Sequence, residues 1–157
     1  MIARLLTQRA CLDEAARLIR DLPGPILEIG LGKARTYDRL RALFPDREIF
    51  ALDRDVHCPP ELAPDAAHLL LGDFRETLQF LQAGIGRGAA LAHADIGSHD
   101  RARDARLAAD ITPLIARLVR PGGVVATDRE MPGPGWQALP LPEGAGVWPY
   151  YLYRVGR

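Results

Sequence analysis

Ile-Leu-Glu-Ile-Gly-Leu-Gly-Lys-Ala-Arg-Thr-Tyr, residues 26–37, combines a strand pattern, a glycine turn and the start of a helix. The apolar run around Glu28 breaks at Gly30 and Gly32, and helical spacing of apolar residues begins near Arg35. Glycine has no Cβ and tolerates positive φ, and the first turn of a helix has free N–H groups, so a ligand can approach such a turn closely. Glu28 is expected at the carboxyl end of the strand, where ligands bind in open α/β sheets. The stretch therefore predicts a ligand-binding turn, with a tight turn that binds nothing as the alternative.

Residues 28–34, Glu-Ile-Gly-Leu-Gly-Lys-Ala, resemble the first motif of class I S-adenosylmethionine-dependent methyltransferases, an acidic residue followed by Gly-x-Gly-x-Gly. Ala34 stands at the third glycine of that motif. The dinucleotide motif Gly-x-Gly-x-x-Gly needs a small residue at Arg35, which argues against a dinucleotide-dependent oxidoreductase. The resemblance implies S-adenosyl-L-methionine as the cofactor and an enzyme that transfers its methyl group to an N, O or C nucleophile. A non-catalytic sensor or scaffold that binds this cofactor is a further alternative.

The resemblance covers nearly the whole chain from Leu22 and implies an α/β fold. The expected architecture is a three-layer Rossmann-like, doubly wound, mostly parallel sheet with an antiparallel C-terminal strand and with the first and fourth strands central. The chain beyond the first strand and turn predicts a helix over 101–119 that kinks at Pro113 or starts anew there with Thr112 as its cap. Residues 130–135 are too short and too rich in proline and glycine for the helix that the family places after its fifth strand. The remaining strands are expected at 48–53, 68–71, 89–97, 124–128, 136–141 and 147–155.

Length and composition predict one globular domain over residues 1–157, because 48% of the residues are hydrophobic and 25% are charged. Twenty basic and twenty acidic residues give no net charge, so we expect neither a nucleic-acid partner nor a membrane surface. A small molecule is therefore the expected methyl acceptor. Cys11 and Cys58 form no disulfide framework and no metal-ligand spacing. The charged N-terminal segment is unlike a signal peptide, and a cytoplasmic protein is the expectation.

Residues 2–22 are predicted to form an amphipathic helix with Leu5, Leu12 and Ile19 on its buried side. In the family such a helix often lies over the ligand crevice, and packing on the sheet or against another subunit is the alternative. An apolar helix stripe and a C-terminal aromatic cluster (Trp148, Tyr150, Tyr151 and Tyr153) would need cover, so a homo-oligomer is expected. The alternative is that these residues fill the core of the monomer.

Acidic residues at strand ends supply the remaining cofactor contacts. Asp53, about twenty residues beyond the glycines, is placed to accept both ribose hydroxyls, because two carboxylate oxygens match two neighbouring donors. Asp73 resembles the family residue that accepts from the adenine amino group, and capping the next helix is its alternative role. The cofactor-binding set that follows is Glu28, Gly30, Leu31, Gly32, Thr36, Asp53, Arg54, Gly72, Asp73, Phe74 and Asp95.

The fourth expected strand carries the densest polar chemistry of the chain. In a doubly wound sheet it borders the first strand, so its carboxyl end faces the methyl group to be transferred. Asp95 is expected to hold the methionine ammonium or the substrate, and His99 is a candidate general base because its ordinary pKa lies near neutrality. These two residues are the predicted catalytic pair, and the alternative is that they merely line a wet cleft. A metal held by His93, Asp95, His99 and Asp100 is disfavoured, because nothing fixes a complete ligand set.

Overall fold

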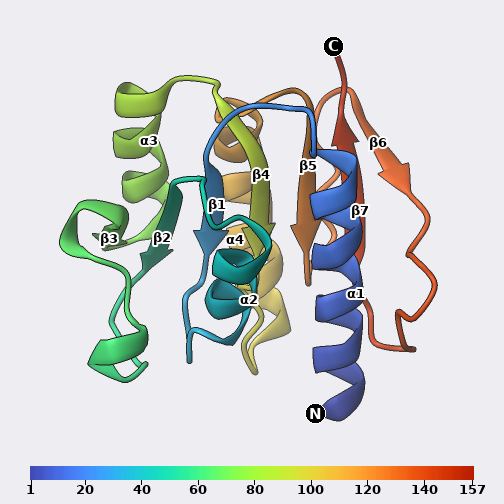
Figure 1. Cartoon of the computed structure of the whole chain (residues 1–157), viewed down its shortest axis with the longest axis horizontal. Coiled ribbons are helices and arrows are strands. Elements are labelled where there is room, and N and C mark those ends of the chain that lie inside the picture. The colour runs from blue at the N-terminus through green and yellow to red at the C-terminus, as the bar shows by residue number, and fades with distance from the viewer.

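Seven strands form one sheet in the computed structural model, which describes residues 1–157 (Figure 1). Their order is β3-β2-β1-β4-β5-β7-β6. Neighbouring strands from β3 to β5 are parallel, β7 is antiparallel to β5, and β6 is antiparallel to β7. The expected fold is therefore confirmed, with β1 and β4 at its centre. The strands are β1 Ile26–Ile29, β2 Ile49–Asp53, β3 Leu69–Leu71, β4 Ala89–Ala94, β5 Val119–Thr127, β6 Trp136–Leu139 and β7 Tyr151–Val155.

Helices cover both faces of the sheet. Helix α1 (Ile2–Leu18) and α2 (Arg35–Leu43) lie in front of it in Figure 1, whereas α3 (Phe74–Ile85) and α4 (Arg101–Ala116) pack together on the opposite face. Each face has its own apolar layer, because successive residues of a strand point to opposite sides. The central strands β1 and β4 are buried on both faces and are almost entirely apolar in sequence.

Helix α1 differs from its sequence-based prediction in length and in buried face. It ends at Leu18 instead of residue 22, and Leu5 is 37% exposed. The buried side carries the polar residues Thr7 and Gln8 together with Cys11 and Leu12. The N-terminal half of α1 extends beyond the carboxyl ends of the parallel strands (Figure 1), so it meets a polar edge instead of an apolar sheet face. No helix of the protein is both long and apolar enough to cross a bilayer.

Helix α4 runs without interruption through Pro113, so of the two alternatives the new start at Thr112 is wrong. The Thr112 hydroxyl donates instead to the carbonyl oxygen of Ala108, at 2.6 Å, inside the helix. Strand β5 also begins earlier than expected, at Val119, and includes residues 121–123. Its pairing with β4 skips between Ala89 and Leu91, and this irregularity accommodates the extra residues.

The connections agree with the sequence more closely. Two short 3-10 turns, Pro60–Leu62 and Ala66–His68, join β2 to β3 in place of a crossover helix. No helix follows β5, because residues 128–135 form bends and a turn before β6 begins. Strands β6 and β7 are shorter than the predicted 136–141 and 147–155 but form the expected antiparallel hairpin.

Candidate functional site

The turn after β1 is held open by backbone conformations that favour glycine. Gly30 has a φ of 97°, Gly32 a φ of 51° and Ala34 a φ of 65°. A Cβ on Gly30 would lie 2.2 Å from the carbonyl oxygen of Asp95, whereas a Cβ on Gly32 would meet nothing within 4 Å. No side chain therefore fits at position 30, where the backbone packs against the segment that follows β4. Gly32, by contrast, faces free space just before α2. Ala34, at the third glycine of the motif, keeps the left-handed conformation that a glycine would adopt there.

Asp53, at the end of β2, braces this turn. One carboxylate oxygen accepts from the Gly32 amide at 3.0 Å, and the other accepts from the Arg54 amide at 2.7 Å. The Arg54 guanidinium contacts Asp73, which caps α3 by accepting from the Arg75 amide at 2.8 Å. This amide bond, together with the two arginines, lowers the pKa of Asp73. The predicted ribose and adenine residues therefore lie together along one edge of the sheet, Asp73 also performing its alternative capping role.

Glu28 is completely buried and is cross-strand neighbour to His93 of β4. Its Oε1 lies 2.6 Å from His93 Nδ1, and His93 Nε2 contacts the hydroxyl of buried Tyr150. Burial raises the pKa of Glu28; burial alone would lower the pKa of His93, but the Glu28 charge raises it. The second oxygen, Oε2, is buried and has no hydrogen-bond partner. A buried acceptor without a donor is costly, so Oε2 is open to a further donor at this end of β1.

Asp95 follows β4 and lies directly beside the glycine turn. Its amide donates to the Ile29 carbonyl at 2.9 Å, and its carboxylate accepts from Arg4 and Gln8 of α1. Burial raises the pKa of Asp95, but the charges of His93 and Arg4 outweigh this and hold its pKa below the ordinary value. Asp95 is thus an ionised anchor beneath the N-terminal helix.

Asp128, at the end of β5, is the second buried carboxyl at this edge. Its oxygens accept from the amides of Ile96 and Gly97, at 3.1 and 2.9 Å. Burial raises the pKa of Asp128 to about 6, and the neighbouring Asp95 charge adds to the rise. A carboxyl with a pKa near 6 can both accept and release a proton close to neutral pH.

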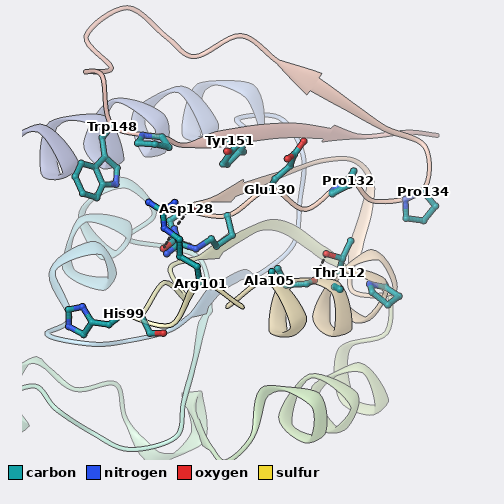
Figure 2. Close-up of a pocket in the computed structure, with 16 residues that line it drawn as sticks. His99, Arg101, Ala105, Thr112, Asp128, Glu130, Pro132, Pro134, Trp148 and Tyr151 are labelled. Carbon is teal, nitrogen blue, oxygen red and sulfur yellow. Dashed lines mark hydrogen bonds and ion pairs between the residues drawn. The ribbon is translucent and has the colours of Figure 1, made fainter. Parts of the chain in front are cut away.

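A cavity of about 1190 Å³ opens beside Asp128 (Figure 2). Small residues of α4, including Ala105 and Ala108, form one wall, and Trp148 and Tyr151 stand across from them. Its polar floor is fixed by Asp104, which accepts from the Ser98 amide and hydroxyl and from Arg129. His99 is exposed and lies at one end of the cavity, apart from Asp128 (Figure 2).

The structure thus brings most of the predicted residues to one edge of the sheet, where the two predicted catalytic residues have different surroundings. Asp95 is tied to α1, whereas His99 belongs to the cavity on the α4 side. The alternative metal set is dispersed as well, because His93 is buried against Glu28 while Asp100 caps α4. No group of three or more His, Cys, Asp or Glu side chains is arranged to hold a metal ion.

Four residues of this edge were not predicted as site residues: Arg4, Gln8, Asp128 and Tyr150. Arg4 and Gln8 are four residues apart, so they share a helix face, but only the tertiary fold aims that face at Asp95. Asp128 carried a usable signal, since it ends the predicted strand 124–128 just as Asp53 ends the predicted strand 48–53.

Comparisons with known proteins agree with this geometry. A family model described as S-adenosyl-L-methionine methyltransferase matches residues 1–155. The chain is similar to the crystal structure of an S-adenosyl-L-methionine methyl transferase from Silicibacter pomeroyi DSS-3, with 42% identity and a TM-score of 0.91 over 98% of this chain and 94% of that one. A 16S rRNA (adenine(1408)-N(1))-methyltransferase from Catenulisporales acidiphilia is 15% identical, with a TM-score of 0.58 over 92% and 91% of the two chains. That likeness concerns the fold alone. No curated protein sequence matches the chain.

Proposed function

Because the chain belongs to the S-adenosyl-L-methionine methyltransferase family, we propose that it methylates a small molecule held in the cavity beside Asp128. The family makes the chain a methyltransferase that uses S-adenosyl-L-methionine, and the acceptor is the open question. The observation that carries the proposal is the cavity itself. Its volume of about 1190 Å³ is at the scale of small-molecule sites, and it adjoins the carboxyl ends of β4 and β5. The zero net charge of the chain favours a small molecule over a nucleic acid.

The residues of the edge fit the cofactor. Gly32 faces open space, and Glu28 Oε2 is a buried acceptor without a donor. In the proposed site, Asp53 and Arg54 meet the ribose, and the segment Gly72, Asp73 and Phe74 meets the adenine. Leu31 and Thr36 flank the amino-acid part, whose ammonium lies between Asp95 and Glu28. Once bound, the cofactor supplies a sulfonium methyl group that a nucleophile can displace.

The protein itself contributes alignment and a proton acceptor. Asp128 is buried, lines the cavity and is held by two backbone amides, so its carboxylate is fixed where a nucleophile would lose its proton. His99, the base expected from the sequence, lines the same cavity near its rim. The dependence of the turnover rate on pH identifies the proton acceptor. If turnover falls below about pH 6 in the wild type but not in Asp128→Asn, Asp128 is the acceptor. If this fall in turnover at acidic pH is absent only in His99→Gln, His99 is the acceptor.

The test is to incubate the protein with S-adenosyl-L-methionine that carries a labelled methyl group, offering metabolite extract and total RNA in separate reactions. We expect label in a metabolite and none in RNA, as read by mass spectrometry. Label found only in RNA would reject the proposed acceptor class. Asp53→Ala, which lacks the proposed ribose contact, is the matched control and should reduce the transfer at subsaturating cofactor.

A cytoplasmic location and a homo-oligomeric state remain parts of the proposal. Exposed apolar side chains near the N-terminus support self-association, Ile2 being 76% and Leu6 54% exposed. Light scattering at micromolar concentration measures the oligomeric state, and a monomer would reject the proposed homo-oligomer.

A further inference from the structure

We infer that Arg4 of α1 binds the carboxylate of the cofactor's amino-acid group, so that Arg4 and Asp95 together recognise a zwitterion. This inference rests on the proposed position of the cofactor at the glycine turn. It adds a residue from the N-terminal helix to a site that the sequence assigned to strand ends and their turns.

The first step is geometric. A single nitrogen of Arg4, Nη2, lies 2.7 Å from each oxygen of Asp95, and Gln8 Nε2 lies 2.9 Å from Oδ2. Asp95 in turn adjoins the glycine turn, since its carbonyl oxygen lies where a Cβ of Gly30 would be. The guanidinium therefore lies beside the residue that adjoins the turn, at the edge where the amino-acid end of the cofactor is proposed to bind.

The second step concerns unused hydrogen-bonding capacity. Arg4 has five N–H donors, and neither Nε nor Nη1 makes a hydrogen bond in this structure. The Arg4 side chain is 40% exposed, against 17% for Asp95, so part of the Arg4 side chain is accessible to a ligand. The unused Nη1 can therefore donate to a second carboxylate through a charge-assisted hydrogen bond while Nη2 keeps its contact with Asp95.

The third step is charge complementarity. Asp95 alone would favour any cation, but its charge is already balanced by Arg4. An amino-acid group brings an ammonium and a carboxylate together, so it adds a second pair of opposite charges beside the first. The ammonium then meets Asp95 and the carboxylate meets Arg4, and each charge has an opposite neighbour. A ligand with only an ammonium or only a carboxylate would pair with just one of Asp95 and Arg4.

The competing explanation is that Arg4 only fastens α1 to the sheet. Three ligands separate the two roles when their affinities are measured by calorimetry. S-adenosylhomocysteine has both charged groups, decarboxylated S-adenosylmethionine has only the ammonium, and 5′-methylthioadenosine has neither. We expect Arg4→Gln to weaken S-adenosylhomocysteine by about 10- to 100-fold, the usual range for a lost charged hydrogen bond. The affinity for 5′-methylthioadenosine should change less than about twofold, and the affinity for decarboxylated S-adenosylmethionine should not fall, since neither complex has the contact.

Asp95→Asn and Arg17→Gln are the matched variants. Asp95→Asn should weaken the two ligands that carry the ammonium and spare 5′-methylthioadenosine. Arg17 pairs with Glu14 on the same helix, about 20 Å from Arg4 at 1.5 Å per residue, so Arg17→Gln should change nothing.

Equal weakening of all three ligands by Arg4→Gln, or no weakening of S-adenosylhomocysteine, would overturn the inference. Absence of binding of every adenosyl ligand to the wild-type protein would instead reject the cofactor site itself. If Arg4→Gln fails to fold, the wild-type affinities decide. S-adenosylmethionine must then bind at least about tenfold more tightly than its decarboxylated form, and equal affinities would reject the contact.

Discussion

At the scale of single residues, Asp95 and Asp128 show how neighbouring carboxyls take different charge states. Arg4 and His93 keep Asp95 ionised against the effect of its burial. Asp128 has only backbone amides and a partly shielded Arg129 nearby, and burial together with the Asp95 charge raises its pKa to about 6. One carboxyl is therefore suited to hold a cation and the other to exchange a proton.

The raised pKa of Asp128 predicts a pH-dependent stability. Between pH 4 and 6 the folded protein keeps this carboxyl protonated, whereas the unfolded chain, with the ordinary value of 3.8, has released the proton. The contribution of Asp128 to the free energy of unfolding is thus fully present below pH 4 and falls by about 3 kcal/mol as the pH rises through 6. Asp128→Asn has no titrating carboxyl at this position. As the pH rises from 4 through 6, the free energy of unfolding of the wild-type protein should therefore fall relative to that of the variant.

Urea unfolding at several pH values measures this difference. Asp21→Asn, which changes a carboxyl on the exposed surface, is the control and should run parallel to the wild type. Parallel curves for Asp128→Asn as well would show that Asp128 titrates normally.

At the scale of elements, the turn between β1 and α2 separates two roles of glycine. Gly30→Ala places a Cβ against the Asp95 carbonyl in a left-handed conformation and should cost about 3 kcal/mol or more, or prevent folding. Gly32→Ala meets no atom and should cost only about 1–2 kcal/mol for its left-handed backbone. The added methyl group of Gly32→Ala nevertheless points into the proposed cofactor space and should weaken S-adenosylhomocysteine.

Unfolding curves and calorimetry of the two variants check this division. A Gly32→Ala protein with full affinity would mean that the cofactor does not approach this turn, and a fully stable Gly30→Ala protein would contradict the packing of the turn against β4.

The sequence predicted what is local in these elements. Residues 28–34 indicated the turn, and Asp53 and Asp73 are at strand ends that hydrophobic runs and glycines mark. It did not predict the contacts that join distant segments. The side-chain hydrogen bonds from Glu28 to His93 and from His93 to Tyr150 join three strand regions. These contacts form only once the strands are in register. The buried face of α1 was predicted correctly at Leu12 and Ile19 but not at its N-terminal end, because Thr7 and Gln8 face polar partners that the helix pattern cannot show.

At the scale of the whole molecule, the parallel strands deliver Glu28, Asp53, Asp95 and Asp128 to one edge, and α1 closes that edge from the N-terminus. The missing helix after β5 leaves space between α4 and the segment 130–134, and the cavity occupies it. The absence of this helix was predicted from the prolines and glycines of 130–135, but the cavity was not. Its walls come from α4, from the segment after β5 and from the approach to β7, whose packing no single stretch specifies.

Calorimetric titration with S-adenosylhomocysteine and NAD, on the wild-type protein and on Asp53→Ala, tests the central claim most directly. We expect S-adenosylhomocysteine to bind the wild-type protein with one site per chain, and we expect no binding of NAD. Asp53→Ala should remain folded by circular dichroism and lose about 1.5–3 kcal/mol of binding free energy, since it lacks a charge-assisted contact to the ribose. Binding of NAD without S-adenosylhomocysteine, or full affinity of Asp53→Ala, would contradict the assignment of this edge as the cofactor site.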